Sequence, residues 1–239
     1  MIDYHSHILP GIDDGARTLD EAIGMARVLA AAGCRTVHCT PHCIPGVYAT
    51  VPGQVREAVA ALQAELDAAG VGLRLVPGME YYLDEYFPEQ LERALPLGDS
   101  DLLLVEAPGQ AHADLLRENL FLARRRGFTP LIAHPERYRW WAPPPPPKSG
   151  LWARLRSRRA PQPASGGFPT IDDLHAQGCL LQGNLGSLAG RYGPEVRRRA
   201  LYLLHAGLYT HFGSDAHRLD GLEGMVKGGK AVIGEAGCI

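Results

Sequence analysis

Short apolar runs alternate with segments of helical periodicity along most of the chain. In the helical segments the apolar residues recur every three or four positions, as Val55, Val59, Leu62 and Leu66 do. The run at 102–105 is continuously apolar, which is typical of a strand buried on both faces of a parallel sheet. Such runs predict seven strands, at residues 2–5, 35–40, 73–76, 102–105, 129–133, 180–182 and 208–212. The alternation predicts an α/β protein built from seven successive βα units.

The ends of the predicted helices carry capping signals. Thr18 followed by Glu21 predicts a capping box, in which the hydroxyl and the carboxylate satisfy free backbone amides at a helix start. Gly33 ends this helix, because glycine readily adopts the left-handed conformation that follows a last turn. The other helices are predicted at 54–69, 115–126, 170–177 and 195–206.

Two segments depart from this alternation. Residues 142–167 contain five consecutive prolines, a pair of glycines and a basic stretch without any acidic residue, which predicts a loop insertion. The segment after Asp220 is short and rich in glycine, so we expect a weakly folded C-terminus. The basic residues of the insertion are Lys148, Arg154, Arg156, Arg158 and Arg159.

Composition limits the class of protein without identifying its chemistry. The 239 residues are 46% hydrophobic and 21% charged, which predicts one globular domain spanning 1–239. A net charge of -2 gives no electrostatic reason to expect binding to nucleic acid or to a membrane surface. The five cysteines do not resemble a disulfide framework, and there is no signal peptide or long apolar span. We therefore expect a cytoplasmic protein without stable membrane insertion.

Nine side chains of metal-binding type lie at or after the ends of predicted strands. In an extended His-x-His segment, both imidazoles project to the same side because strand side chains alternate, so His5 and His7 can bind one ion. Side chains spread over the whole chain converge only if the fold closes on itself, as a parallel barrel does. The nine candidate ligands are His5, His7, Asp14, His42, Glu80, Glu106, His134, Asp215 and His217.

Other polar residues have two interpretations each. Asp13 competes with Asp14 for the ligand position, and the two also fit an ordinary turn before Gly15. Asn184 either binds substrate or caps the turn after its strand. The remaining histidines fall within predicted strands or helices, where core or solvent roles are expected; they are His38, His112, His175, His205 and His211.

The composition of the ligand set predicts hydrolytic chemistry. Nine nitrogen and oxygen ligands without an obligatory thiolate require two or three divalent ions, and mixed imidazole and carboxylate ligands suit manganese, iron or zinc. Such ions lower the pKa of bound water toward about 7 and neutralise charge on an attacked ester. A bound hydroxide is therefore the expected nucleophile.

The segments that carry these ligands resemble the polymerase-and-histidinol-phosphatase (PHP) superfamily. Within it, the chain is most similar to the bacterial metal-dependent protein-tyrosine phosphatases of capsule and exopolysaccharide gene clusters. The similarity runs from Met1 to about Asp220. The matching segments are His5 to Gly15, Thr40-Pro-His42, Gly78-Met-Glu80, His134-Pro-Glu-Arg-Tyr138 and Ser214-Asp-Ala-His217.

The resemblance implies more than the residues alone. It implies a distorted TIM-like (β/α)7 barrel of the PHP type, a three-ion site usually associated with manganese, and a phosphotyrosine-bearing protein as substrate. That substrate would be the tyrosine-rich tail of a partner bacterial tyrosine kinase, and relatives form ring-like homo-oligomers.

It also implies a role for individual residues. His5, His7, Glu80 and Asp215 would surround a first ion, and Glu80 would be shared with a second ion bound by Glu106 and His134. The third ion would be held by Asp14, His42 and His217. Arg137 would bind the phosphate through its planar fork, with an ion pair to Glu136 as the structural alternative. Catalytic roles are thus predicted for Arg137, for Asp14 and, as a second candidate for the phosphate, for Arg218.

Three other functions compete with a metal-dependent tyrosine phosphatase. A small-molecule phosphatase of the same superfamily, acting on histidinol phosphate or a nucleotide, would share the ligands. A barrel retained as a non-catalytic scaffold would not need the complete set of candidate ligands. A cysteine-dependent phosphatase needs an arginine six positions after its cysteine, and no such arginine follows Cys34, Cys39, Cys43 or Cys179.

The insertion follows Tyr138 and is therefore expected on the catalytic face of the barrel. Its positive charge either steers a phosphorylated tail toward the metals or has no role.

Overall fold

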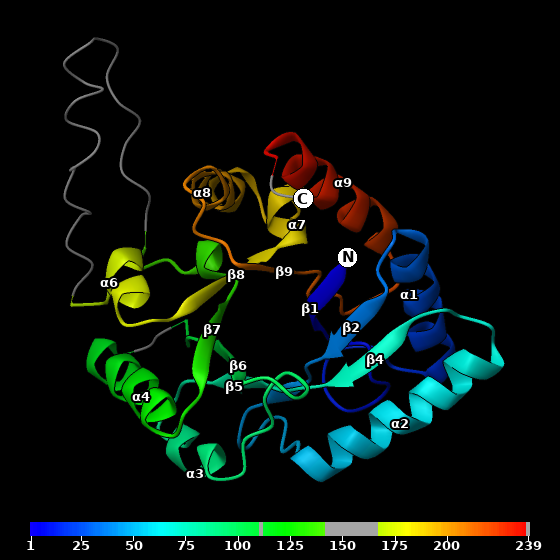
Figure 1. Cartoon of the computed structure of the whole chain (residues 1–239), viewed down its shortest axis with the longest axis horizontal. Helices are drawn as coiled ribbons and strands as arrows, with labels where there is room; N and C mark the ends of the chain where they lie inside the picture. Colours follow the sequence, from blue (N-terminus) through cyan, green and yellow to red (C-terminus); the bar gives the residue numbers. More distant parts are fainter. Residues whose placement is uncertain (110–111, 142–166, 238–239) are drawn as a thin grey trace.

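Parallel strands surrounded by helices form the molecule (Figure 1). This computed structural model describes residues 1–109, 112–141 and 167–237. The strands are β1 (Ile2–Ser6), β2 (Thr36–Cys39), β3 (His42–Cys43), β4 (Arg74–Pro77), β5 (Glu80–Tyr82), β6 (Leu102–Glu106), β7 (Thr129–Ala133), β8 (Leu180–Asn184) and β9 (His211–Gly213). The helices are α1 (Leu19–Ala31), α2 (Pro52–Ala68), α3 (Phe87–Leu91), α4 (Ala113–Arg125), α6 (Ile171–Ala176), α7 (Leu185–Leu188), α8 (Pro194–His205) and α9 (Leu222–Glu235), with a 3₁₀ turn, η1 (Pro135–Arg137).

The strands form two parallel sheets, ordered β1-β2-β4 and β3-β5-β6-β7-β8-β9. Two residues outside any strand separate β2 from β3, and two separate β4 from β5. Backbone hydrogen bonds nevertheless join the two sheets at these positions. The amide of Gly78 donates to the carbonyl of Cys39, and that of Glu80 to Pro41, each over 3.0 Å. The predicted α/β class with parallel strands is confirmed. The short β3 and β5 were not predicted, because two or three residues carry no readable periodicity.

The first and last strands lie side by side. The amide of Asp215 donates to the carbonyl of His5 over 2.7 Å, and the amide of His7 donates to Ala216 over 3.0 Å. These bonds bring the two ends of the ligand set together.

Alternation along β6 separates two environments. Leu103 and Val105 belong to the large core that the strands share with the helices. Leu104 belongs to a separate small cluster with Leu131 and other buried side chains. Because side chains alternate, Glu106 at the end of β6 lies on the same face as Leu104. An apolar layer therefore underlies the position where Glu106 is presented.

At the start of α1, the predicted cap by the Thr18 hydroxyl is confirmed. The Thr18 hydroxyl accepts from the amide of Glu21 over 3.2 Å. The Glu21 carboxylate accepts from the amide of Arg17 at 2.9 Å, one residue before the amide that a capping box uses.

The last strand begins later than predicted. In the segment expected as a strand at 208–212, residues 208–210 belong to no regular element, and β9 covers His211–Gly213. Gly207 adopts a left-handed conformation after α8, and the amide of Leu208 bonds back to the carbonyl of Leu203. Leu208, the first residue of the predicted strand, therefore caps the end of α8 instead of forming a strand.

The expectation of a weakly folded C-terminus is wrong. Residues 222–235 form α9, which buries Leu222, Val226 and Ile233 against the rest of the molecule. Its glycines permit close packing: a Cβ at Gly229 would lie 2.5 Å from the carbonyl oxygen of Leu185 in α7. Low helix propensity is thus offset by tertiary packing.

The predicted insertion at 142–167 lies outside the described residues, apart from Gly167. Among the helices that the structure describes, none is both long enough and apolar enough to cross a membrane.

Candidate metal centre

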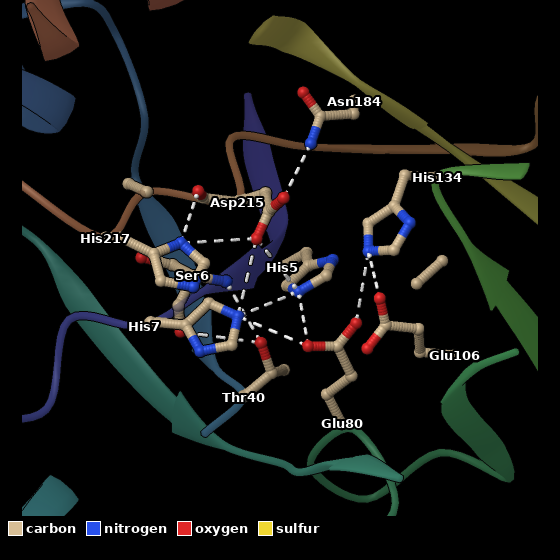
Figure 2. Close-up of polar contacts among 12 residues, drawn as sticks. His5, Ser6, His7, Thr40, Glu80, Glu106, His134, Asn184, Asp215 and His217 are labelled. Atoms are coloured by element: carbon tan, nitrogen blue, oxygen red, sulfur yellow. Dashed lines mark hydrogen bonds and ion pairs between the residues drawn. The ribbon is translucent and has the colours of Figure 1, made fainter. Parts of the chain in front are cut away.

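The nine predicted ligands converge at one edge of the parallel strands, where the strand carboxyl ends meet. Figure 2 shows those other than Asp14 and His42. Their ligand atoms form four overlapping groups, within each of which all atoms lie within 4.8 Å of one another. The groups are His7, Asp14, His42 and His217; His5, His7 and Asp215; His5, Glu80 and His134; and His42, Glu80 and Glu106.

Glu80 lies at the middle of this cluster. It begins β5 directly beside His42 of β3, and its side chain is almost fully buried. Its Oε2 atom lies 3.1 Å from His5 Nε2 and 3.0 Å from His42 Nδ1, and its Oε1 atom lies 3.3 Å from His134 Nε2. One carboxylate therefore reaches imidazoles from β1, from β3 and from the residue that follows β7.

The unmatched polar atoms of the cluster test whether the residues fit metal ions. Both carboxylate oxygens of Glu80 and the Nδ1 atom of His42 are buried without a hydrogen bond of good geometry, although they lie at ion-pair distance from each other. The Nε2 atoms of His5 and His7 lie only 3.0 Å apart. Buried polar atoms left in this way are costly unless something binds them. Cations between them would satisfy these atoms, so the site fits metal ions.

Electrostatics in the cluster also favour bound cations. Burial opposes protonation of His5, but the negative charges of Glu80 and Asp215 outweigh it and raise its pKa to about 9. Burial and then the charge of Glu80 raise the pKa of Glu106 to about 7. Burial and the positive charge of Arg137 lower the pKa of His134 to about 4. A cation between Glu80 and Glu106 would favour the ionised forms of both carboxylates.

Backbone strain is concentrated in the same cluster. Among the described residues, His134 with a φ of 34° and Asp215 with a φ of 53° are the only non-glycine residues in the left-handed region. Such conformations are unfavourable for residues with a Cβ, and they persist mainly at functional sites.

Asp13 and Asp14, which compete in the sequence, have different positions. Asp14 Oδ1 lies 3.4 Å from His217 Nε2 and 3.7 Å from His42 Nε2, so Asp14 is in the cluster. Asp13 Oδ2 lies 2.7 Å from His7 Nδ1 and also accepts from the amide of His42. Asp13 therefore orients two candidate ligands, while Asp14 faces the ligand atoms.

Gln182 was missed by the sequence analysis. It lies in β8, is fully buried, and its Oε1 atom is 3.1 Å from His5 Nδ1. The same oxygen accepts from the amide of His134 over 3.2 Å. A polar residue in an otherwise buried strand was the available signal, because such residues need a specific partner.

Of the two roles predicted for Asn184, the structure shows the cap of the turn after its strand. Its Oδ1 atom caps α7 by accepting from the amide of Ser187 over 3.0 Å. Its Nδ2 atom donates to Asp215 Oδ2 over 2.8 Å (Figure 2). Asn184 thus holds Asp215 in place and caps a helix at the same time.

Arg137 faces the cluster and forms no surface pair with Glu136. Its Nη1 atom donates to Asp215 Oδ2 over 2.8 Å, and its guanidinium lies 4.8 Å from the centre of the Tyr192 ring. Glu136 is fully buried and accepts from the hydroxyl of Tyr209 over 2.8 Å. The structural alternative for Arg137 is therefore excluded.

A cavity of about 260 Å³ opens beside the cluster. Arg218 lines it, and its guanidinium donates to the carbonyls of Gly15 and His217. The lining residues are Arg137, Arg191, Tyr192, Asp215, Ala216, His217, Arg218, Leu222 and Met225.

The described cysteines do not form a thiolate nucleophile. Cys34, Cys39, Cys43 and Cys179 are all buried. Burial raises the pKa of Cys34 to about 12 and that of Cys43 to about 11. They remain neutral thiols near neutral pH.

Comparison with known proteins places the chain among bacterial capsule proteins. Residues 1–142 match the family described as "Capsular polysaccharide synthesis, CpsB/CapC". The tyrosine-protein phosphatase YwqE of Bacillus subtilis is 34% identical over 222 residues, which are 92% of this chain and 78% of that protein.

Solved structures give the same result. The crystal structures of YwqE from Bacillus subtilis and CpsB from Streptococcus pneumoniae, described as unique metal-dependent tyrosine phosphatases, include a match with a TM-score of 0.80 and 29% identity. That match covers 100% of this chain and 88% of the other. Histidinol phosphate phosphatase from Lactococcus lactis shares the fold, with a TM-score of 0.55 and 17% identity over 99% of this chain and 93% of its own.

Proposed function

The chain belongs to the CpsB/CapC family of capsular polysaccharide synthesis, and on that premise we propose that it is a metal-dependent phosphatase that hydrolyses phosphotyrosine on proteins. Its relatives carry the name tyrosine-protein phosphatase. The observation that carries the proposal is the convergence of nine ligand side chains beside a cavity lined by Arg137.

The nine converging residues would hold two or three divalent ions, manganese first and iron or zinc as alternatives. Bound ions would acidify a coordinated water and screen the negative charge of the phosphoryl oxygens. Glu80 would bridge two ions, because its two oxygens face different imidazoles.

The chain's own residues would orient the substrate. Arg137 offers a planar pair of donors that matches two phosphoryl oxygens, and its contact with Asp215 sets it beside the ligands. Asn184 donates to the same Oδ2 atom of Asp215, so the carboxylate keeps one orientation. Arg218 is the second candidate for a phosphate contact, since it lines the same cavity.

Further parts of the proposal concern the whole protein. The two sheets would form one distorted (β/α)7 barrel of the PHP type, supported by the bonds between β1 and the segment after β9. The chain would be a single domain over 1–239 that carries its insertion at 142–167. The substrate would be the tail of a bacterial tyrosine kinase in the cytoplasm, and the enzyme would form a homo-oligomer.

The test compares substrates, metals and variants in one assay. The protein is stripped with a chelator, reloaded with manganese, zinc or iron, and given a phosphotyrosine peptide, a phosphoserine peptide and histidinol phosphate. We expect phosphotyrosine to be the preferred substrate. His7→Ala and Asp215→Ala should each remove most activity. His7 belongs to two of the ligand groups, and Asp215 is a ligand held in a left-handed backbone conformation. Cys43→Ser, the control, should keep turnover within a few-fold.

Other outcomes favour the competing functions. Preference for histidinol phosphate would identify a small-molecule phosphatase. Metal binding without turnover of any substrate would indicate a scaffold. Full activity after chelation, with loss of activity in Cys43→Ser, would exclude the metal mechanism.

A further inference from the structure

The cavity beside the metal centre holds more positive charge than one phosphate requires. Asp215 and His217 on its wall belong to the candidate ligand set, and Arg137 is paired with Asp215. Two further guanidiniums, those of Arg191 and Arg218, also line it. Within the described residues, neither of these two arginines forms an ion pair with a carboxylate.

The position of Arg191 follows from the start of α9. Gly221 precedes this helix with a φ of 69°, and a Cβ added there would lie 3.1 Å from Arg191 Nη1. The missing side chain therefore lets the guanidinium lie against the helix start. The backbone amide of Arg191 donates to the carbonyl of Gly186 over 2.9 Å, which ties its loop to α7.

The helix start adds to the positive potential. No side chain caps α9, and the amides of a first helical turn carry partial positive charge. Glu223 lies in this turn, but it is exposed and pairs with Lys227 at the next turn. Within the described residues, neither Asp220, directly before Gly221, nor Glu223 forms an ion pair with a guanidinium of the cavity.

Apolar side chains also line the cavity. Leu222 and Met225 of α9 line it, and both are buried. Tyr192 adds an aromatic ring that is already in contact with the Arg137 guanidinium. A cavity with cationic and apolar walls fits a peptide segment better than a free phosphate ion.

We propose that Arg191 forms a second anion subsite beside Arg218, which binds a phosphate or carboxylate group next to the phosphotyrosine that is hydrolysed. This inference rests on the proposed phosphotyrosine activity, and it adds a preference for acidic or multiply phosphorylated segments. Arg191 is a specificity residue in this scheme, because no hydrogen bond or ion pair joins its side chain to a candidate ligand within the described part of the chain.

The experiment uses three peptides with one phosphotyrosine in the same position. Its neighbours are glutamine in the first, glutamate in the second and a second phosphotyrosine in the third. Steady-state kinetics with the metal-loaded full chain give kcat and KM for each peptide. The variants are Arg191→Gln and, as a matched control, Arg125→Gln, which removes an exposed arginine of α4.

The wild-type protein should prefer the acidic peptides, and Arg191→Gln should reduce that preference roughly tenfold, as expected for one charge-assisted hydrogen bond. The loss should appear in KM, because the flanking anion is bound equally in the ground and transition states. Arg191→Lys should restore part of it. Arg125→Gln should keep the wild-type preference. The peptide with the larger effect identifies carboxylate or phosphate as the preferred anion.

A binding measurement gives the second readout. The same three peptides, carrying a non-hydrolysable phosphotyrosine analogue, are titrated by fluorescence anisotropy against the wild-type protein and Arg191→Gln, and thermal melting confirms that the variant is folded. Equal preference in the wild type and Arg191→Gln would overturn the subsite, as would an equal loss in Arg125→Gln. Failure of the wild type to hydrolyse any phosphotyrosine peptide would instead overturn the proposed function itself.

Discussion

At the residue scale, the candidate ligands depend on neighbours that do not face the ions. Asp13 holds His7 through its Nδ1 atom, Gln182 holds His5, and Asn184 holds Asp215. Each of these bonds fixes which atom of the ligand is presented to the cluster. Partners of this kind commonly change metal affinity by about 10- to 100-fold when they are removed.

Replacing Asp13 with asparagine should therefore weaken metal binding. Burial opposes ionisation of Asp13, but its hydrogen bond and charge interaction with His7, together with the Gly15 and His42 amides, outweigh burial and lower its pKa to about 2, so the residue is a carboxylate at neutral pH. Asp13→Asn removes this charge while keeping the size of the side chain. We expect manganese affinity to fall by about 10- to 100-fold, measured by calorimetric titration. Asp67→Asn on the exposed face of α2 is the control, and equal affinities in the two variants would contradict the role of Asp13.

Replacing Arg137 with lysine should separate charge from geometry. Lysine keeps the positive charge but lacks the planar pair of donors, and it also loses the stacked contact with Tyr192. We expect kcat/KM toward an aryl phosphate to fall by about 5- to 150-fold, equivalent to about 1–3 kcal/mol of transition-state binding. Unchanged catalytic efficiency would show that Arg137 does not contact the phosphoryl group.

At the element scale, the packing of α9 on α7 supports the site from outside. Leu185 begins α7 directly after Asn184, which bonds to Asp215. Gly229 of α9 lies so close to Leu185 that no side chain fits between them. Movement of either helix would therefore displace the residue that restrains Asp215.

Two glycines of α9 with different surroundings, Gly229 and Gly224, provide a direct test of the close packing between α9 and α7. A Cβ at Gly229 would lie 2.5 Å from a carbonyl oxygen, whereas one at Gly224 would meet nothing within 4 Å. Gly229→Ala should lower the free energy of unfolding by about 1–3 kcal/mol through overpacking. Gly224→Ala should raise it by up to about 1 kcal/mol through helix propensity. Chemical denaturation of both variants measures this, and equal effects would contradict the close packing.

At the scale of the whole molecule, stability should depend on pH through a buried histidine outside the cluster. Burial lowers the pKa of His38 in β2 to about 4, and nearby His211 and Arg74 add to the effect. The unfolded chain, with a histidine pKa near 6.5, therefore binds a proton that the folded protein does not. Stability contributed by neutral His38 is present above about pH 6.5 and is lost as the pH falls toward about 4.

His38→Phe should remove this part of the pH dependence. Phenylalanine keeps a flat ring against Tyr4, which stacks on His38 at 5.1 Å, but it cannot bind a proton. Between pH 7 and pH 5 the wild type should lose about 2 kcal/mol more unfolding free energy than the variant does. Urea denaturation at both pH values measures the difference, and parallel losses in the two proteins would assign the pH dependence to other groups.

The sequence by itself determined the alternation of the longer strands and helices up to α8 and the identity of the candidate ligands. Strand and helix periodicity are local, so β6, β7, α2 and α4 were predicted to within a few residues. Ligand types are equally local, because imidazoles and carboxylates that recur at successive predicted strand ends can be read directly from the sequence. The structure brings all nine predicted side chains together, Asp14 rather than Asp13 among them.

Only the tertiary structure decided what depends on contacts between distant segments. The helix at 222–235 forms because glycines allow it to approach α7, although its composition alone predicts weak folding. Gln182 orients His5 from 177 residues away, and Arg191 reaches the cavity because Gly221 leaves room for it. Such relations are set by three-dimensional closure of the chain, and no periodicity along the sequence encodes which distant residue will lie opposite another.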